Sequence, residues 1–164
     1  MTDNNNVFWY SEGVDAVKIG DQSTTSSGMT AEYNLENWKY PAIYDTGTSL
    51  IYAPGGVGTE LQLRLAHGKE YIHDSSSGLM MVNCDEKASY EDFYLTIDDY
   101  QFKILAEDYI LAFDDTDDAG VTTTVCFMGI VASNDMSYWL LGDVFLTGYY
   151  SIFDNSDHNL EFIP

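Results

Sequence analysis

The residues best suited to chemistry lie in one short stretch, in which a single acid, Asp45, is followed by a glycine and small hydroxyl residues. Thr46, Thr48 and Ser49 surround Gly47, which lets the backbone turn back sharply. Hydroxyl and backbone N–H groups aimed at a carboxylate favour its ionised form and fix its orientation. The stretch is therefore a candidate site for carboxylate chemistry. The alternative is a polar turn whose aspartate binds its own backbone.

Two apolar runs must hold this turn in place. Ala42-Ile43-Tyr44 precedes the acid, and Leu50-Ile51-Tyr52 follows the hydroxyl residues. Isoleucine and tyrosine are typical of strands. The sequence therefore predicts a strand, a tight turn that carries Asp45, and a second strand.

Three other stretches invite a functional interpretation but lack the residues for it. Gly55-Gly56-Val57-Gly58 is not followed by Lys-Ser/Thr, so we expect a chain break and not a phosphate loop. His67 and His73 stand in polar surroundings without further ligands, which indicates solvated side chains. Residues 114–120 are acidic but lack the spaced ligands and closing glutamate of an EF-hand, so we expect an exposed hairpin tip. We expect neither a metal nor a cofactor.

Composition limits the partners of the chain. Its 164 residues fit one compact domain, and its 27 acids against 6 lysines and arginines give a net charge of −21. Because such a chain repels phosphates, we expect no nucleic-acid partner and no membrane partner. The polar residues 1–6 do not form a signal peptide, so the chain is either cytosolic or starts downstream of its natural N-terminus. Cys84 and Cys126 would form a disulfide in a secreted protein and remain thiols in a cytosolic one.

The rest of the chain reads as short strands and turns, which predicts an all-β barrel or sandwich-like lobe. Thr59–His67 is the strongest helix candidate, Ala106–Tyr109 fits one helical turn, and Asp98-Asp99 fits a two-residue hairpin turn. Further strands are expected at residues 7–10, 14–19, 30–35, 79–84, 93–97, 100–104, 110–113, 122–131, 138–141, 151–154 and 160–163.

Nearly the whole chain resembles the second lobe of a pepsin-like aspartic protease. The Asp-Thr-Gly-Thr-Ser-Leu stretch is similar to the active-site motif of that lobe, and Leu-Leu-Gly-Asp-Val-Phe is similar to its downstream motif. The matching stretches, in chain order, are Phe8-Trp9 with Val14–Gly20, Asp45–Leu50, Val82–Cys84, Tyr109–Leu111, Cys126, Trp139–Leu146, Phe153-Asp154 and Leu160–Ile163. The resemblance implies an all-β fold, namely a single lobe of the pepsin-like acid protease fold that is closed or partly open like a barrel and has one or two short helices. Residues 1–164 would form this one domain, with the N-terminal lobe absent.

The resemblance also implies roles for individual residues. Asp45 would be one of two aspartates, one from each lobe, that activate a water molecule for attack on a peptide bond. Ser49 would lie towards the substrate, and Cys84 and Cys126 would form a disulfide. The residues expected to support the site are Thr46, buried against the other lobe's loop; Gly47, with its N–H on the carboxylate; Thr48, bonded to the outer carboxylate oxygen; and Gly142, packed under the loop.

The sequence contains one Asp-Thr-Gly, so it supplies half of such a site. We therefore expect an aspartic endopeptidase whose isolated lobe is inactive until it pairs with the N-terminal lobe of the same protease. Two alternatives remain open, a homodimer with Asp45 from each copy and a non-catalytic lobe that binds or inhibits. Peptide or protein substrates are implied, and the cysteine pair and the resemblance indicate a secreted, lysosomal or vacuolar protein.

Overall fold

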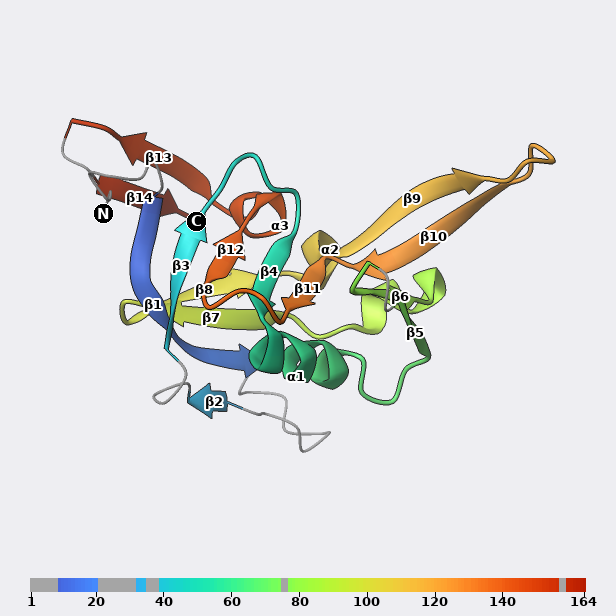
Figure 1. The fold of residues 1–164 in the computed structure, drawn as a ribbon, viewed down its shortest axis with the longest axis horizontal. Helices are drawn as coiled ribbons and strands as arrows, with labels where there is room; N and C mark the ends of the chain where they lie inside the picture. Colours follow the sequence, from blue (N-terminus) through green and yellow to red (C-terminus); the bar gives the residue numbers. More distant parts are fainter. Residues whose placement is uncertain (1–8, 21–31, 35–38, 75–76, 157–158) are drawn as a thin grey trace.

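Three β-sheets form most of the computed structural model, which describes residues 9–20, 32–34, 39–74, 77–156 and 159–164 (Figure 1). The largest sheet has the order β11-β4-β12-β3-β1-β7-β8, with β2 paired to β1. Since β11 and β8 are its two ends, this sheet is open and not closed into a barrel. Its strands are β1 (Trp9–Ile19), β2 (Glu32–Asn34), β3 (Tyr40–Tyr44), β4 (Ile51–Pro54), β7 (Phe93–Ile97), β8 (Tyr100–Ile104), β11 (Ile130–Ser133) and β12 (Trp139–Leu141).

Two smaller sheets project from the body. The four-stranded sheet β5-β6-β10-β9 comprises β5 (Tyr71–Asp74), β6 (Leu79–Val82), β9 (Ile110–Thr116) and β10 (Thr122–Met128). The outer part of β9 and β10 extends as a long arm, and β13 (Tyr150–Asp154) and β14 (Asn159–Ile163) form a separate hairpin (Figure 1). The predicted all-β fold is confirmed.

Helices connect several of the consecutive strands. They are α1 (Gly55–Leu65), the 3₁₀ helix η1 (Cys84–Ser89), α2 (Ala106–Tyr109) and α3 (Asp143–Leu146). α1 and α2 correspond to the expected helix and helical turn, and η1 and α3 are too short to show a helical period in sequence. No helix in the described ranges has the length and apolarity needed to cross a membrane.

The glycines before Thr59 were expected to interrupt the regular structure. This expectation is wrong, because these glycines form the first turn of α1. This helix packs on β4 and β11. A side chain at Gly58 would lie 2.9 Å from the Cα of Ala132, and one at Gly55 would overlap Asn134. The glycines therefore let the helix approach the sheet closely.

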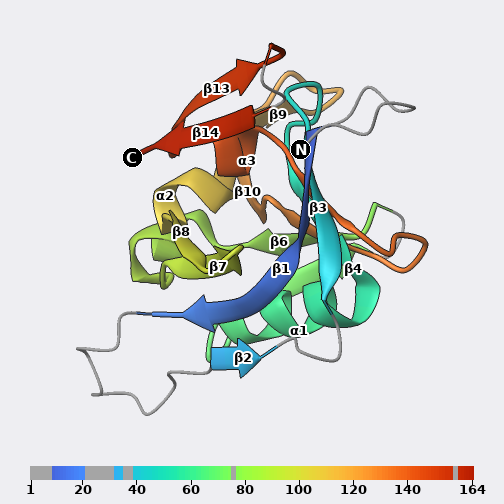
Figure 2. The same cartoon turned by 90° about the vertical axis from the view of Figure 1, so that its left-hand side faces the viewer.

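β1 is one continuous strand where two were expected. Its first half pairs with β3 and its second half with β7, and the register shifts between Ser11 and Val14 in the pairing with β3 (Figure 2). The predicted strand at residues 30–35 is present as β2, and the rest of that range, like residues 7 and 8, lies outside the described residues. The hairpin of β7 and β8 is confirmed, with Asp98 and Asp99 at its turn, both at positive φ.

The predicted disulfide between Cys84 and Cys126 is confirmed, with a Cα–Cα distance of 5.2 Å. It joins the chain just after β6 to the neighbouring strand β10, where Cys126 faces Val82. The bridge closes a loop of 42 residues. Chain-entropy arguments give such a bridge a contribution of about 4 kcal/mol to the free energy of unfolding.

Candidate active site

The Asp45 turn joins two strands, as predicted, but these strands, β3 and β4, are not neighbours in the sheet. β12 lies between β3 and β4, parallel to β3 and antiparallel to β4. The turn therefore spans the end of an inserted strand that comes about ninety residues later in the chain. The backbone N–H of Asp45 donates to the carbonyl of Leu141, the last residue of that strand, at 3.0 Å.

The junction of β12 and α3 holds the turn from below through three backbone N–H groups. Asp143 donates to the Thr48 carbonyl at 2.8 Å. The other two bonds run from Gly142 to Leu50 and from Val144 to Ser49, each at 3.2 Å. Because every bond uses backbone atoms, the turn has a fixed path that side-chain motion does not change.

This backbone support was missed by sequence reasoning, which assigned a role only to Gly142. Backbone N–H groups such as those of Asp143 and Val144 cannot be recognised from the type of side chain. The only signal in the sequence was their position directly after the apolar Trp139–Leu141 run. The structure also explains why residue 142 is a glycine. A Cβ at Gly142 would overlap the Thr48 carbonyl and lie 2.6 Å from the Leu50 carbonyl oxygen.

Two donors from the turn itself bind the Asp45 carboxylate. The Gly47 N–H donates to Oδ1 at 2.9 Å, and the Thr48 hydroxyl donates to Oδ2 at 2.6 Å. A Cβ at Gly47 would stand only 3.2 Å from Oδ1, so a residue without a side chain suits this contact. The side chain of Asp45 is half-buried, which leaves the carboxylate oriented and still accessible.

Thr46 and Ser49 are both exposed at the surface of the turn. Thr46 is therefore not buried within this lobe, and neither side chain is needed to hold the carboxylate. The turn lies at the same end of the molecule as the β13–β14 hairpin and the β9–β10 arm (Figures 1 and 2).

The other candidate residues stay apart from this site. His67 and His73 are exposed, and residues 114–120 form the tip of the β9–β10 arm. At that tip an Asp117 carboxylate oxygen accepts hydrogen bonds from the backbone of Ala119 and Val121, which stabilises the turn. Within the described part of the chain, no three His, Cys, Asp or Glu side chains are grouped so as to hold a metal ion.

Next to Asp45, the ring of Tyr44 is buried, and its hydroxyl donates to Ser11 Oγ at 3.2 Å. Burial raises the pKa of Tyr44 from 10.0 to about 12, and the charge of Asp98 adds to the rise. The folded state therefore prefers the neutral phenol, and this stabilisation is complete below the unfolded pKa and disappears as the pH rises through the folded one. We expect this group to lower the free energy of unfolding by about 2 kcal/mol between pH 10 and pH 12, out of about 3 kcal/mol over its whole transition. Urea denaturation across this range measures the fall.

The control for this prediction is Tyr44→Phe, which keeps the ring and removes the titration. Its free energy of unfolding should fall less steeply than that of the wild type over the same pH range. Equal slopes for the two proteins would contradict the prediction. The buried Tyr109 also has a raised pKa, so a smaller decline should persist in the variant.

Comparisons with known proteins agree with one another. The model of the eukaryotic aspartyl protease family matches residues 4–164. The chain is 32% identical to pepsin A of Sus scrofa over 124 residues, or 75% of this chain and 29% of pepsin A. It is 34% identical to gastricsin of Oryctolagus cuniculus over 122 residues (74% and 29% of the two chains) and 30% identical to gastricsin of Callithrix jacchus over 156 residues (94% and 35%). The chain thus spans 29% to 35% of the length of these relatives.

Proposed function

Because the chain belongs to the eukaryotic aspartyl protease family, we propose that it is the second lobe of a two-lobed aspartic endopeptidase and that Asp45 is one of its two catalytic aspartates. The observation that carries this proposal is the carboxylate held by the Gly47 N–H and the Thr48 hydroxyl on an accessible turn. Both carboxylate oxygens are bonded, one by each donor, so the orientation of the group is fixed while it stays accessible.

In this proposal a water molecule lies between Asp45 and the aspartate of the other lobe. One carboxylate accepts a proton as the water oxygen attacks the peptide carbonyl carbon, and the other gives a proton to the carbonyl oxygen. Two carboxylates close together separate their proton affinities, so one proton is shared between them at acid pH. Gly47 and Thr48 orient Asp45 for this step, and Gly142 supports the loop. Ser49, which is exposed beside the carboxylate, faces the peptide substrate.

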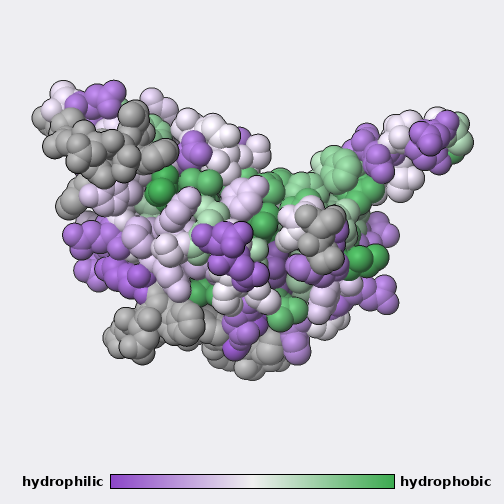
Figure 3. Space-filling model, viewed as in Figure 1, coloured by the Kyte–Doolittle hydropathy of each residue, from purple (hydrophilic) through white to green (hydrophobic). Residues whose placement is uncertain are grey.

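The partner in this proposal is the first lobe of the same protease, seated on the end of the molecule that carries the Asp45 turn. Apolar side chains gather along that edge of the body, between the two projecting hairpins (Figure 3). Large apolar residues are exposed on both hairpins, among them Ile152 and Ile163 on one and Phe113 on the other. Exposed apolar surface of this kind marks an interaction site. Thr46, exposed on the turn, would be covered by the loop of the first lobe.

The disulfide supports the compartment that we propose. A bridge between Cys84 and Cys126 persists in an oxidising environment, which supports a secreted, lysosomal or vacuolar protease. The excess of acids over bases is compatible with work at acid pH, because protonation then relieves the mutual repulsion of carboxylates.

The test is peptidase activity at acid pH on an unfolded protein substrate, measured for this chain alone over a wide concentration range and for the full-length gene product. We expect the chain alone to be inactive and the full-length protein to be active. The full-length protein should lose its activity when the two lobes are separated. Activity of the chain alone that rises with the square of its concentration would instead establish a homodimer with Asp45 from each copy. A full-length protein without activity would favour a non-catalytic lobe that binds or inhibits.

A further inference from the structure

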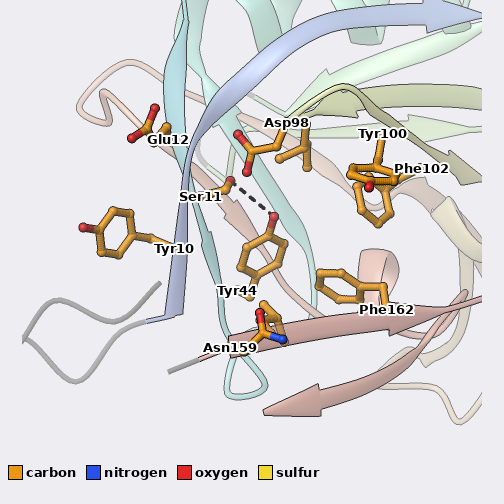
Figure 4. A pocket seen from close by; sticks show the side chains of 11 residues that line it. Tyr10, Ser11, Glu12, Tyr44, Asp98, Tyr100, Phe102, Asn159 and Phe162 are labelled. Carbon is orange, nitrogen blue, oxygen red and sulfur yellow. Dashed lines mark hydrogen bonds between the residues drawn. The ribbon is translucent and has the colours of Figure 1, made fainter. Parts of the chain in front are cut away.

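A hollow lies outside the Asp45 turn, between the start of β1, the β7–β8 turn and β14. Its volume is about 470 Å³, enough for an amino-acid side chain and its surroundings. Figure 4 shows its walls, which come from segments far apart in the sequence. The hollow is therefore built by the tertiary fold and is no feature of a single loop.

Several aromatic rings stand together in its wall. Tyr44, Tyr100, Phe102 and Phe162 all line it (Figure 4). The ring of Phe162 lies 5.1 Å from that of Tyr44 and 5.3 Å from that of Phe102, so these rings support one another. Tyr100 is exposed at the rim. Aromatic faces carry negative electrostatic potential and attract cations.

One carboxylate, that of Asp98, lies on the same side of β1 as the rings, and the carboxylate of Glu12 points away from them across the strand (Figure 4). Asp98, at the β7–β8 turn, and Glu12, on β1, both line the hollow and are exposed. Neither forms an ion pair with a described residue, because the nearby Lys39 ammonium binds Asp15 at 2.8 Å. The hollow therefore combines apolar rings with negative charge that is not neutralised by contact.

The local field already favours positive charge. The hydrogen bond to Asp15 is the largest cause of the raised pKa of Lys39, and the charges of Asp98 and Glu12 raise it further. Asp98 also contributes to the raised pKa of Tyr44, after burial. The charge of Asp98 thus acts both on Lys39, beside the hollow, and on Tyr44, in its wall.

We propose that this hollow binds the basic side chain of a polypeptide, a lysine or an arginine, with its apolar stem against the aromatic rings and its cationic end beside Asp98. The site combines the two attractions known for such groups, ring faces and carboxylates. It is separate from the proposed catalysis, and it is tested by binding and not by activity.

The experiment is equilibrium dialysis of the protein against N-acetyl-lysine methylamide and N-acetyl-arginine methylamide at physiological salt, with neutral N-acetyl-norleucine methylamide as the matched probe. We expect both cationic probes to bind at least about fivefold more tightly than the norleucine probe. Equal binding of the three probes would overturn the proposal, because the hollow would then be only apolar. Failure of both cationic probes to bind would overturn it as well.

The β7–β8 turn offers a matched pair of variants. Asp98 and Asp99 both have positive φ, a conformation that asparagine tolerates, and only Asp98 lines the hollow. We expect Asp98→Asn to weaken binding of the cationic probes about three- to fivefold and Asp99→Asn to change it less than about twofold. Equal losses would show a general effect of net charge and would overturn the site.

A third variant tests the rings. Tyr100 is 73% exposed, so Tyr100→Leu should leave the protein folded, as circular dichroism can verify. We expect this variant to weaken the cationic probes about threefold and to leave the norleucine probe unchanged. Loss of all three probes to the same extent would contradict a role of the ring in cation binding.

Discussion

Replacement of Asp45 by asparagine in the full-length protein is expected to lower kcat by about 10³-fold or more at acid pH, with little change in KM. Asparagine keeps the size of the side chain; its carbonyl oxygen can accept the hydrogen bond from the Gly47 N–H, and its NH2 group can donate to the Thr48 hydroxyl oxygen. It cannot take a proton from water, which is the step assigned to this carboxylate. Steady-state hydrolysis of a peptide substrate, with the variant checked for an unchanged unfolding midpoint, measures the effect.

The matched control for this variant is Asp118→Asn, the same chemical change at an exposed position on the tip of the β9–β10 arm. This control should keep the wild-type kcat. If Asp45→Asn also kept it, the lobe would not be catalytic, and the hydrogen bonds to Asp45 would serve only to shape the turn.

Substitution of Gly142 by alanine is expected to lower the free energy of unfolding by about 3 kcal/mol and to displace the Asp45 turn. The added Cβ would overlap the Thr48 carbonyl and approach the Leu50 carbonyl, both of which are backbone atoms that cannot rotate away. The three hydrogen bonds from the β12–α3 junction would then lengthen together. Urea denaturation gives the loss of stability, and faster hydrogen exchange of the Asp143 and Val144 amides reports the displacement.

Gly56→Ala is the matched control, because a Cβ at Gly56 meets no atom within 4 Å. Gly56 is exposed in the first turn of α1, so alanine there should be neutral or stabilise by up to about 1 kcal/mol. A Gly142→Ala protein within about 1 kcal/mol of the wild type would contradict the close packing beneath the turn.

Much of the local structure was predictable because its causes are local. The Asp98-Asp99 turn between two alternating runs predicted the β7–β8 hairpin, and its positive φ angles are those such a turn requires. The order of apolar and turn residues likewise predicted an all-β chain. Predictions failed where packing against a distant segment decided the outcome, as in α1, whose first glycines looked like a break but fit closely against β11.

The sequence by itself determined which residues could act: an acid, a glycine and a hydroxyl at fixed spacing, whose hydrogen bonds span only three residues. Only the tertiary structure decided how they are held. β12 enters between β3 and β4, and the N–H groups that follow it bind the Thr48, Ser49 and Leu50 carbonyls. The aromatic hollow beside Asp98 depends in the same way on strands from both ends of the chain. Backbone bonds and cavities between distant segments leave no pattern in sequence, because any residue can supply an N–H group and because a cavity belongs to no single segment.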